Sequence, residues 1–320
     1  MSHLRGAMSL IEATKNDGTS EAFNPLILAV MMIHLILAWI VNPLPHALQM
    51  HAAMKNFSLT AGPLLRLPTF FARLTQLGVT TAEVHTELRS YRATQWAGVT
   101  DEKLARLYSK CCRLACRLSK AIPQNYCVDE TCPVESEPLK FNDTWDNPNQ
   151  RDWSIWGRRD FSTVCLYRII VCVASRRCIA RMMDAMSFDD PNAIYHMIAL
   201  EDADNKVKNL LSLACQDIFD MVPHFFDASC PPSPIPKDAG SGDDNMAFWG
   251  VQKPKIGAYL LMMPLRAIMS IPELPQETYD KVVSIAVQLS QGTGIDLEYI
   301  MVRLCGNLFE EDARTNCFFT

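Results

Sequence analysis

Isolated polar and aromatic residues interrupt several otherwise apolar stretches of this sequence. In such surroundings a hydroxyl or an imidazole can donate a hydrogen bond to a substrate carbonyl or stabilise a developing negative charge. Five residues of this kind are candidate catalytic donors: His34, Tyr167, His196, His224 and Tyr259. Five further residues are candidates for the lining of a substrate pocket: Trp39, Arg168, Trp249, Met262 and Met263. Together they predict an apolar pocket with a few directing donors.

Each of these residues, taken alone, is also what an ordinary helical core or surface contains, so the hypothesis rests on the set. A unimolecular cyclisation or isomerisation fits such a pocket, because it needs mainly confinement and one or two donors to a carbonyl. The same pocket could instead bind an effector without converting it. In both cases the expected partner is an apolar small molecule.

Motifs of other reactions are absent from the sequence: there is no nucleophile elbow, phosphate-binding loop, dinucleotide fingerprint or paired-histidine zinc helix. His46 and His51 are five residues apart, which does not place two ligands on one helix face. Asp190 is followed by Pro191 and lacks the third carboxylate, one turn further on, that a magnesium site needs. Capping and a solvated turn therefore explain the acidic runs at 189–190 and 201–204 better than a metal site. We therefore expect no metal and no cofactor.

Composition limits the partners further. The chain has 320 residues, 49% of them hydrophobic, which is enough to bury a large core. A formal net charge of -5 gives no overall attraction to phosphate, so we expect no direct nucleic-acid partner. The 12 cysteines mostly follow helix faces, and the first residues lack a secretory pattern. These features predict reduced thiols and an intracellular location, cytoplasmic or nuclear.

Apolar residues recur at helical spacing along most of the chain, and no convincing run of alternating β-branched residues is present. The sequence therefore predicts an all-α fold, a single multi-helix globular domain over 25–320 that follows a flexible arm over 1–24. Irregular inserts are expected at 123–156 and 227–254. The run 25–41 is apolar but shorter than the roughly 20 residues that a membrane span requires, so we expect a buried core helix.

Punctuating residues set the other expected boundaries. The segment 256–270 is apolar almost all round and contains Pro264, which predicts a buried central helix with a kink at the proline. Gly78 should divide 46–98 into shorter helices. The remaining helices are expected at 101–120, from Asp160 as N-cap to Met186, from Asp190-Pro191 onward, at 210–226, from Pro275 to Gly292 and from Leu297 to Leu308.

A basic stripe is expected on the outer face of the 101–120 helix. It could contact an acidic partner, although such stripes are usually only the solvated side of a helix. Its members are Arg106, Lys110, Arg113, Arg117 and Lys120.

Four short motifs follow one another in the last third of the chain: Ile218-Phe-Asp-Met-Val-Pro-His-Phe-Phe, Gly257-Ala-Tyr-Leu-Leu-Met-Met-Pro-Leu-Arg-Ala, Pro275-Gln and Gly294-Ile295. This order resembles the C-terminal part of the regulatory, or middle homology, region of fungal zinc-cluster transcription factors. The apolar helix with His34 and Trp39 resembles, more loosely, an earlier apolar helix of that family.

The sequence departs from the family in its cysteines. The family's DNA-binding module is a compact run of six cysteines, whereas the first cysteine here is Cys111, adjacent to Cys112, and Cys127 and Cys132 stand alone in a loop. No zinc cluster can be built from these positions.

The resemblance therefore implies a regulatory domain that binds a ligand, another regulator or itself without its own DNA-binding domain. A scaffold recruited to fungal secondary metabolism, as a cyclase or isomerase of a terpenoid or polyketide, is the other hypothesis. We favour the enzyme, because a pocket works alone while a lone regulatory domain needs a DNA-bound partner.

Overall fold

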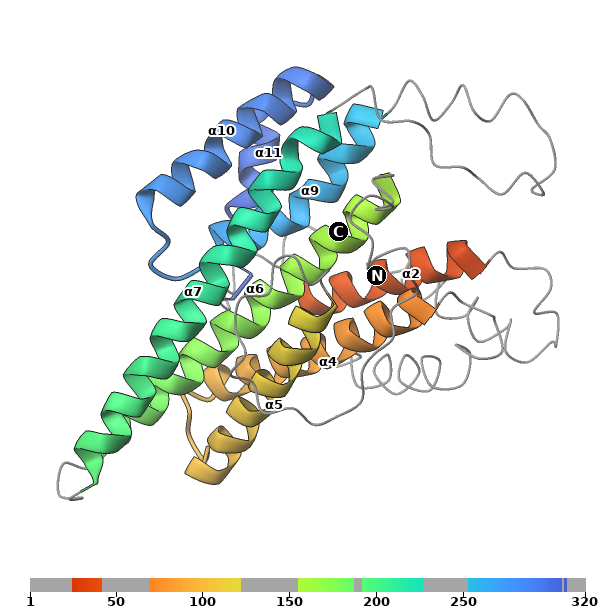
Figure 1. Cartoon of the computed structure of the whole chain (residues 1–320). Coiled ribbons are helices and arrows are strands. Elements are labelled where there is room, and N and C mark those ends of the chain that lie inside the picture. Colours follow the sequence, from red (N-terminus) through yellow and green to blue (C-terminus); the bar gives the residue numbers. More distant parts are fainter. Residues whose placement is uncertain are drawn as a thin grey trace. The chain divides into compact units, whose positions relative to one another are not determined.

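The computed structural model describes residues 25–41, 69–121, 155–186, 192–226, 253–306 and 308–309. These residues form eight α-helices and no strand, which confirms the all-α prediction (Figure 1). The chain divides into two compact units, each taken by itself here: unit 1 contains the helices before residue 121, and unit 2 contains those from Ile155 to Phe309. The arm at 1–24 and most of both inserts lie outside the described residues, and the single domain stays a prediction.

Unit 1 consists of α2 (Pro25–Val41), α4 (Thr69–Ala93) and α5 (Asp101–Lys120). Helix α4 packs against both α2 and α5. One face of α5 is buried, at Leu104, Leu107, Cys111, Leu114 and Leu118, as its helical spacing predicts. Helix α2 begins and ends where the sequence places it, and its core residues are almost fully buried. Among the helices described, none combines the length and apolarity that a membrane crossing needs.

The predicted break at Gly78 is wrong. Helix α4 runs without interruption from Thr69 to Ala93, and both neighbours of the glycine, Leu77 and Val79, are buried. A glycine inside a helix costs about 1 kcal/mol relative to alanine, and burial of its neighbours outweighs that cost.

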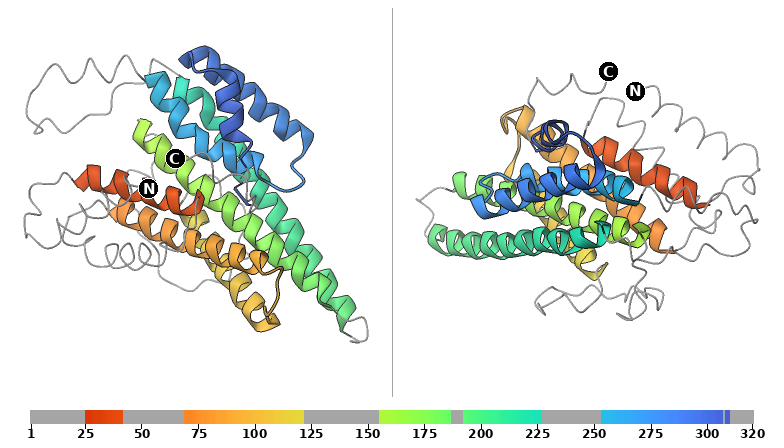
Figure 2. Two further views of the ribbon diagram at one scale, coloured as in Figure 1. Left: turned by 180° about the vertical axis from the view of Figure 1, so that it is seen from behind. Right: turned by 90° about the horizontal axis from the view of Figure 1, so that it is seen from above.

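Unit 2 consists of α6 (Ile155–Asp184), α7 (Ala193–Phe226), α9 (Lys253–Met269), α10 (Gln276–Thr293) and α11 (Leu297–Leu304). Helices α6 and α7 lie side by side as a long hairpin (Figure 2). Helix α9 packs against the other four, so it is the centre of this unit. Its buried residues include Leu261, Leu265, Ala267 and Ile268. Pro264 lies inside the helix, and its kink stays a prediction.

Several predicted boundaries in unit 2 are wrong. Helix α11 ends at Leu304 and not at Leu308. Helix α6 begins at Ile155, so Asp160 is not an N-cap; it is buried and paired with Arg159. The helices expected from Asp190-Pro191 onward and at 210–226 are one continuous helix, α7, of 34 residues. Helix α10 is ended by Gly294, whose φ of 71° suits glycine, and not by Gly292.

The last described residues tie two helices of unit 2 together. Leu308 and Phe309 are buried, and the Leu308 amide donates to Ser270 Oγ at 2.8 Å, just after α9. Arg177 of α6 donates from Nη1 to the Phe309 carbonyl at 2.9 Å, and its guanidinium lies over the Phe309 ring. We call Leu308 and Phe309 the closing segment.

Candidate functional site

The structure divides the candidate site residues between the two units. His34 and Trp39 lie on α2 in unit 1, the first half-buried and the second buried. Trp249 lies outside the described residues. The others belong to unit 2: Tyr167 and Arg168 on α6, His196 and His224 on α7, and Tyr259, Met262 and Met263 on α9.

The two histidines of α7 cannot serve one site. They are 28 positions apart on a single continuous helix, which at about 1.5 Å per residue separates them by about 42 Å. His196 is exposed near the start of the helix, among exposed side chains. The helix position of His224, near the other end, is therefore the one that remains close to the rest of the candidate residues in unit 2.

Tyr167 is the candidate with the most unusual surroundings. Its side chain is fully buried, and no polar group of the described residues lies within hydrogen-bonding distance of its hydroxyl. Burial raises the pKa of the Tyr167 phenol far above its usual value; the charge of Asp160 raises it further, and Arg159 opposes both. The hydroxyl is therefore a neutral donor at physiological pH.

A buried ion pair lies on the same helix as Tyr167. Arg159 donates from Nε to Asp160 Oδ1 at 2.8 Å, and each residue is 3% exposed. Asp160 precedes Tyr167 by seven positions, which is two helical turns, so both lie on one face of α6. A charge pair, a neutral phenol and buried apolar neighbours thus share this face.

In the α6–α7 hairpin, the backbone of His224 on α7 lies at about the same height along the helix pair as Asp160 on α6. Arg168 pairs with Asp217 and Arg176 pairs with Asp204, across 49 and 28 residues of sequence. The number of residues between the paired positions decreases from 49 to 28 along α6, as expected for two antiparallel helices. His224 follows Asp217 by seven positions, so its backbone lies near the level of Asp160.

The Arg168–Asp217 pair is the main polar contact inside the hairpin. Arg168 Nη1 lies 2.6 Å from Asp217 Oδ2, and each side chain keeps only about a tenth of its surface exposed. Burial raises the pKa of Asp217, and the adjacent Arg168 lowers it by less. Arg168 is therefore held by a protein carboxylate, which leaves it less suited to bind a substrate.

Three buried thiols surround this pair. Cys165 and Cys172 come from α6 and Cys215 from α7. Burial raises the pKa of Cys215 to about 12 and that of Cys165 further. Cys165 and Cys215 are therefore neutral thiols at physiological pH and poor nucleophiles or metal ligands. Among the described residues, no group of three or more His, Cys, Asp or Glu side chains could hold a metal ion.

The prediction of reduced thiols fails at one position. Seven of the described cysteines are free, but Cys116 on α5 is disulfide-bonded. The spacing of Cys116 along its helix indicates only which face it shares with its neighbours, so it does not indicate that this thiol is paired.

Asp204 gives the hairpin a contribution to stability that depends on pH. Burial alone would raise the pKa of Asp204, but hydrogen bonds from Lys208 and Arg176 outweigh burial and lower it. A depressed folded pKa stabilises the fold above the unfolded value of about 3.9, and this contribution is lost as pH falls through the folded pKa.

Asp204→Asn should therefore flatten the loss of stability in acid. The measurement is the free energy of unfolding at a series of pH values below neutrality. Asp202→Asn is the matched control, because Asp202 is exposed and its one ion pair among the described residues is with Lys206 in the same helix. An unchanged acid limb in Asp204→Asn would contradict the assigned role.

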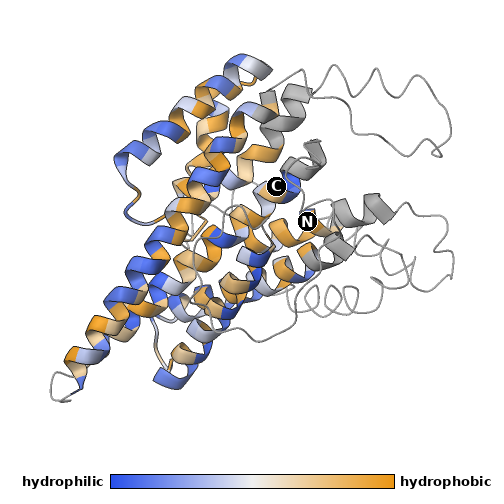
Figure 3. Cartoon of the chain, viewed as in Figure 1, coloured by the Kyte–Doolittle hydropathy of each residue, from blue (hydrophilic) through white to orange (hydrophobic). Residues whose placement is uncertain are grey.

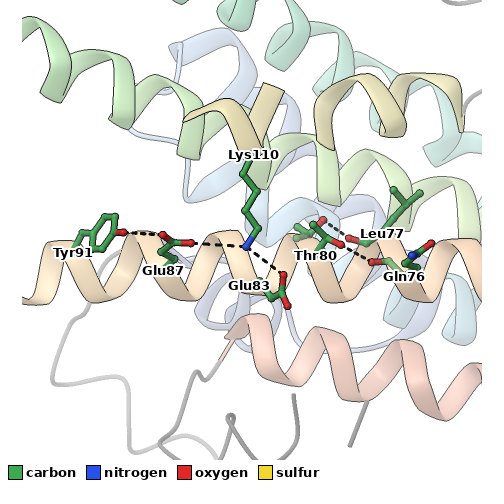
Figure 4. Close-up of polar contacts among 8 residues, drawn as sticks. Gln76, Leu77, Thr80, Glu83, Glu87, Tyr91 and Lys110 are labelled. Atoms are coloured by element: carbon green, nitrogen blue, oxygen red, sulfur yellow. Dashed lines mark hydrogen bonds and ion pairs between the residues drawn. The ribbon is translucent and has the colours of Figure 1, made fainter. Parts of the chain in front are cut away.

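The predicted basic stripe of α5 is largely occupied within unit 1. Lys110 Nζ lies 3.2 Å from Glu83 and 3.8 Å from Glu87 of α4, and Glu87 also accepts from Tyr91 (Figure 4). Arg106 pairs with Glu102, and Arg117 donates to Gln76. These contacts favour the solvated-face interpretation over a docking surface for an acidic partner.

Sequence reasoning missed several buried polar residues. Asp160 is expected only as an N-cap, and Arg159, Asp217 and His85 on α4 are not among the candidate residues. In the structure Arg159 is 3% exposed and His85 1%. Their signal was weak: a charge seven positions before a buried tyrosine shares its helix face, but the sequence does not show which face is inward.

Comparison of the chain with protein-family models, with characterised proteins and with solved structures finds no match.

Proposed function

We propose that unit 2 binds an apolar small molecule with a carbonyl group, and that the protein converts this molecule as a cofactor-independent cyclase or isomerase. The observation that carries the proposal is the Tyr167 hydroxyl, which is fully buried and has no partner among the described residues. Leaving a hydroxyl in that state costs about 1–3 kcal/mol, and an acceptor on a bound molecule would recover it. The resemblance to fungal regulatory regions suggests a terpenoid or polyketide of a fungal pathway.

The chemistry follows from a neutral donor in an apolar site. Tyr167 donates a hydrogen bond to the carbonyl oxygen and stabilises the negative charge that develops there as bonds rearrange within the substrate. Since burial raises the pKa of Tyr167, it remains protonated and donates without giving up its proton. His224 and Tyr259, on helices that pack against α6, are the candidate second donors.

Tyr167→Phe should lower the rate of conversion by about 100-fold, because it removes the donor and keeps the ring. The same variant should unfold at an equal or higher denaturant concentration, since it removes an unsatisfied buried hydroxyl. Rate and unfolding midpoint are both measured on purified protein.

Tyr279→Phe is the matched control, because Tyr279 on α10 is partly exposed. It should change neither quantity. A Tyr167→Phe variant that turns over normally would contradict the role in conversion, and one that is clearly destabilised would show that the hydroxyl serves the fold.

The substrate can be sought directly. Purified protein, without added metal or nucleotide, is incubated with extracts of a host that lacks its gene, and products are separated by chromatography with mass detection. We expect one accumulated compound to change its isomer at constant mass. Binding of a compound without conversion would instead support an effector site.

A regulatory module that binds a protein partner is the second candidate, and a specific surface favours it. Tyr299 and Val302 are about half exposed on one face of α11, three positions apart. The Arg303 guanidinium lies over the Tyr299 ring at 5.1 Å. Tyrosine and arginine are enriched among the residues that dominate protein interfaces. By resemblance, the proposed partner is a zinc-cluster activator.

Tyr299→Ala should weaken capture of such an activator at least about tenfold, as expected for a central interface tyrosine. Binding is measured with purified activator and tagged protein, and Tyr195→Ala, an exposed tyrosine on α7, is the control. Equal binding by both variants would remove the support for the α11 surface.

A further inference from the structure

One face of the first half of α7 is not covered by any other helix that the structure describes in unit 2. Among those helices only α6 runs beside this half of α7, and apolar and polar residues alternate along it (Figures 1 to 3). Three large apolar side chains lie exposed before its midpoint and one lies after it. They are Ile194 (67% exposed), Tyr195 (75%), Ile198 (59%) and Leu213 (52%).

The charges on the same helix are ordered. The acidic residues Glu201 and Asp202 come before Asn205, and the basic residues Lys206 and Lys208 follow it. Asp202 and Lys206 are both largely exposed, and their mutual ion pair is a helix-surface contact of small value. This order is self-complementary: a second α7 in the opposite direction sets acid against base in both halves.

Two of the exposed apolar residues, Ile198 and Leu213, lie at nearly equal distances on either side of Asn205. Ile198 precedes Asn205 by seven positions and Leu213 follows it by eight, about 10.5 and 12 Å along the axis. A two-fold axis through Asn205 therefore brings Leu213 of one copy beside Ile198 of the other. Both residues lie with Asn205 on the exposed face of the helix.

We propose that the occupant of this face is a second copy of the chain, whose α7 packs antiparallel about Asn205. The pairing covers the four exposed apolar side chains and places Asp202 at the level of the partner's Lys208, which also pairs with Asp204 of its own helix. It uses the same patch on both copies, as a closed two-fold dimer requires. This proposal does not rest on the proposed function.

Cross-linking tests the geometry of the pair. Asn205→Cys places two thiols on the axis, within the Cα separation of roughly 4.4–6.8 Å that a disulfide allows. Asn209→Cys, one turn further on the same face, places them about 12 Å apart along the axis. Oxidation should give a covalent dimer for Asn205→Cys well above the level of the unmodified chain, whose Cys112 and Cys305 are exposed, and none above that level for Asn209→Cys.

Association in solution supplies the second measurement. The full chain is studied by sedimentation over a series of concentrations, and Ile198→Glu should raise the dimer Kd at least about tenfold. Tyr279→Glu, at a partly exposed residue on α10, should leave the Kd unchanged. A monomer at every concentration, or equal cross-linking at 205 and 209, would overturn the proposal, as would an effect of Tyr279→Glu as large as that of Ile198→Glu. If the unmodified chain dimerises and Ile198→Glu weakens the dimer without changing turnover, the dimer stands independently of the proposed catalytic function.

Discussion

Arg168→Met is expected to lower the free energy of unfolding of unit 2 by about 3 kcal/mol, because it leaves the Asp217 carboxylate without its partner. The two side chains meet at 2.6 Å and each keeps only about a tenth of its surface exposed. Removing one member of a buried pair is costly because the remaining charge keeps its desolvation penalty. The measurement is chemical denaturation followed by circular dichroism.

The double variant separates the cost of the orphaned charge from the value of the pair. Arg168→Met combined with Asp217→Leu should recover most of the loss, since both charges are then replaced by apolar groups of similar size. Arg106→Met is the surface control: its pair with Glu102 is 71% and 82% exposed, so the change should stay within about 0.5 kcal/mol. A single variant as stable as the double variant would contradict the explanation.

Leu265→Ala should cost about 3 kcal/mol, within the range of 2–5 kcal/mol found for large-to-small changes in cores. Leu265 is fully buried on α9, the helix that packs against all four other helices of unit 2. The substitution leaves a cavity that neighbours on several helices cannot all close at once. Thermal and denaturant unfolding both measure the loss.

Val302→Ala is the exposed counterpart of that variant. Val302 keeps about half of its surface exposed, so its truncation should change the free energy of unfolding by no more than about 0.5 kcal/mol. If Leu265→Ala cost no more than Val302→Ala, α9 would not be the centre of the core.

The pattern of apolar residues predicts most of the fold. The uninterrupted apolar run 25–41 predicts α2 to the residue. Helical periodicity predicts most of the buried face of α5, because a solvated helix separates apolar from polar residues at a spacing that the sequence displays directly. A single glycine was a less reliable guide. Gly78 lies inside α4, because burial along the whole helix outweighs the cost at one position.

The candidate site was harder to predict, since it depends on contacts between distant residues. The sequence identifies Tyr167 as a polar residue in an apolar stretch, but not that its hydroxyl lacks a partner among the described residues. The sequence makes Arg168 a candidate pocket residue, whereas in the structure it pairs with Asp217, 49 positions away. His196 and His224 look equivalent in sequence, yet one long helix holds them about 42 Å apart.

The closing segment has a consequence for the synthesis of the protein on the ribosome. Arg177 finds its acceptor, the Phe309 carbonyl, 132 residues later in the chain. At a translation rate of about 5–20 residues per second, roughly 7–26 s pass between the two. During this time α6 and α7 can already pair, but the guanidinium lacks this acceptor and the sites of Leu308 and Phe309 stay uncovered. The nascent unit 2 therefore exposes apolar surface until its last residues emerge, and this interval is when a chaperone would bind it.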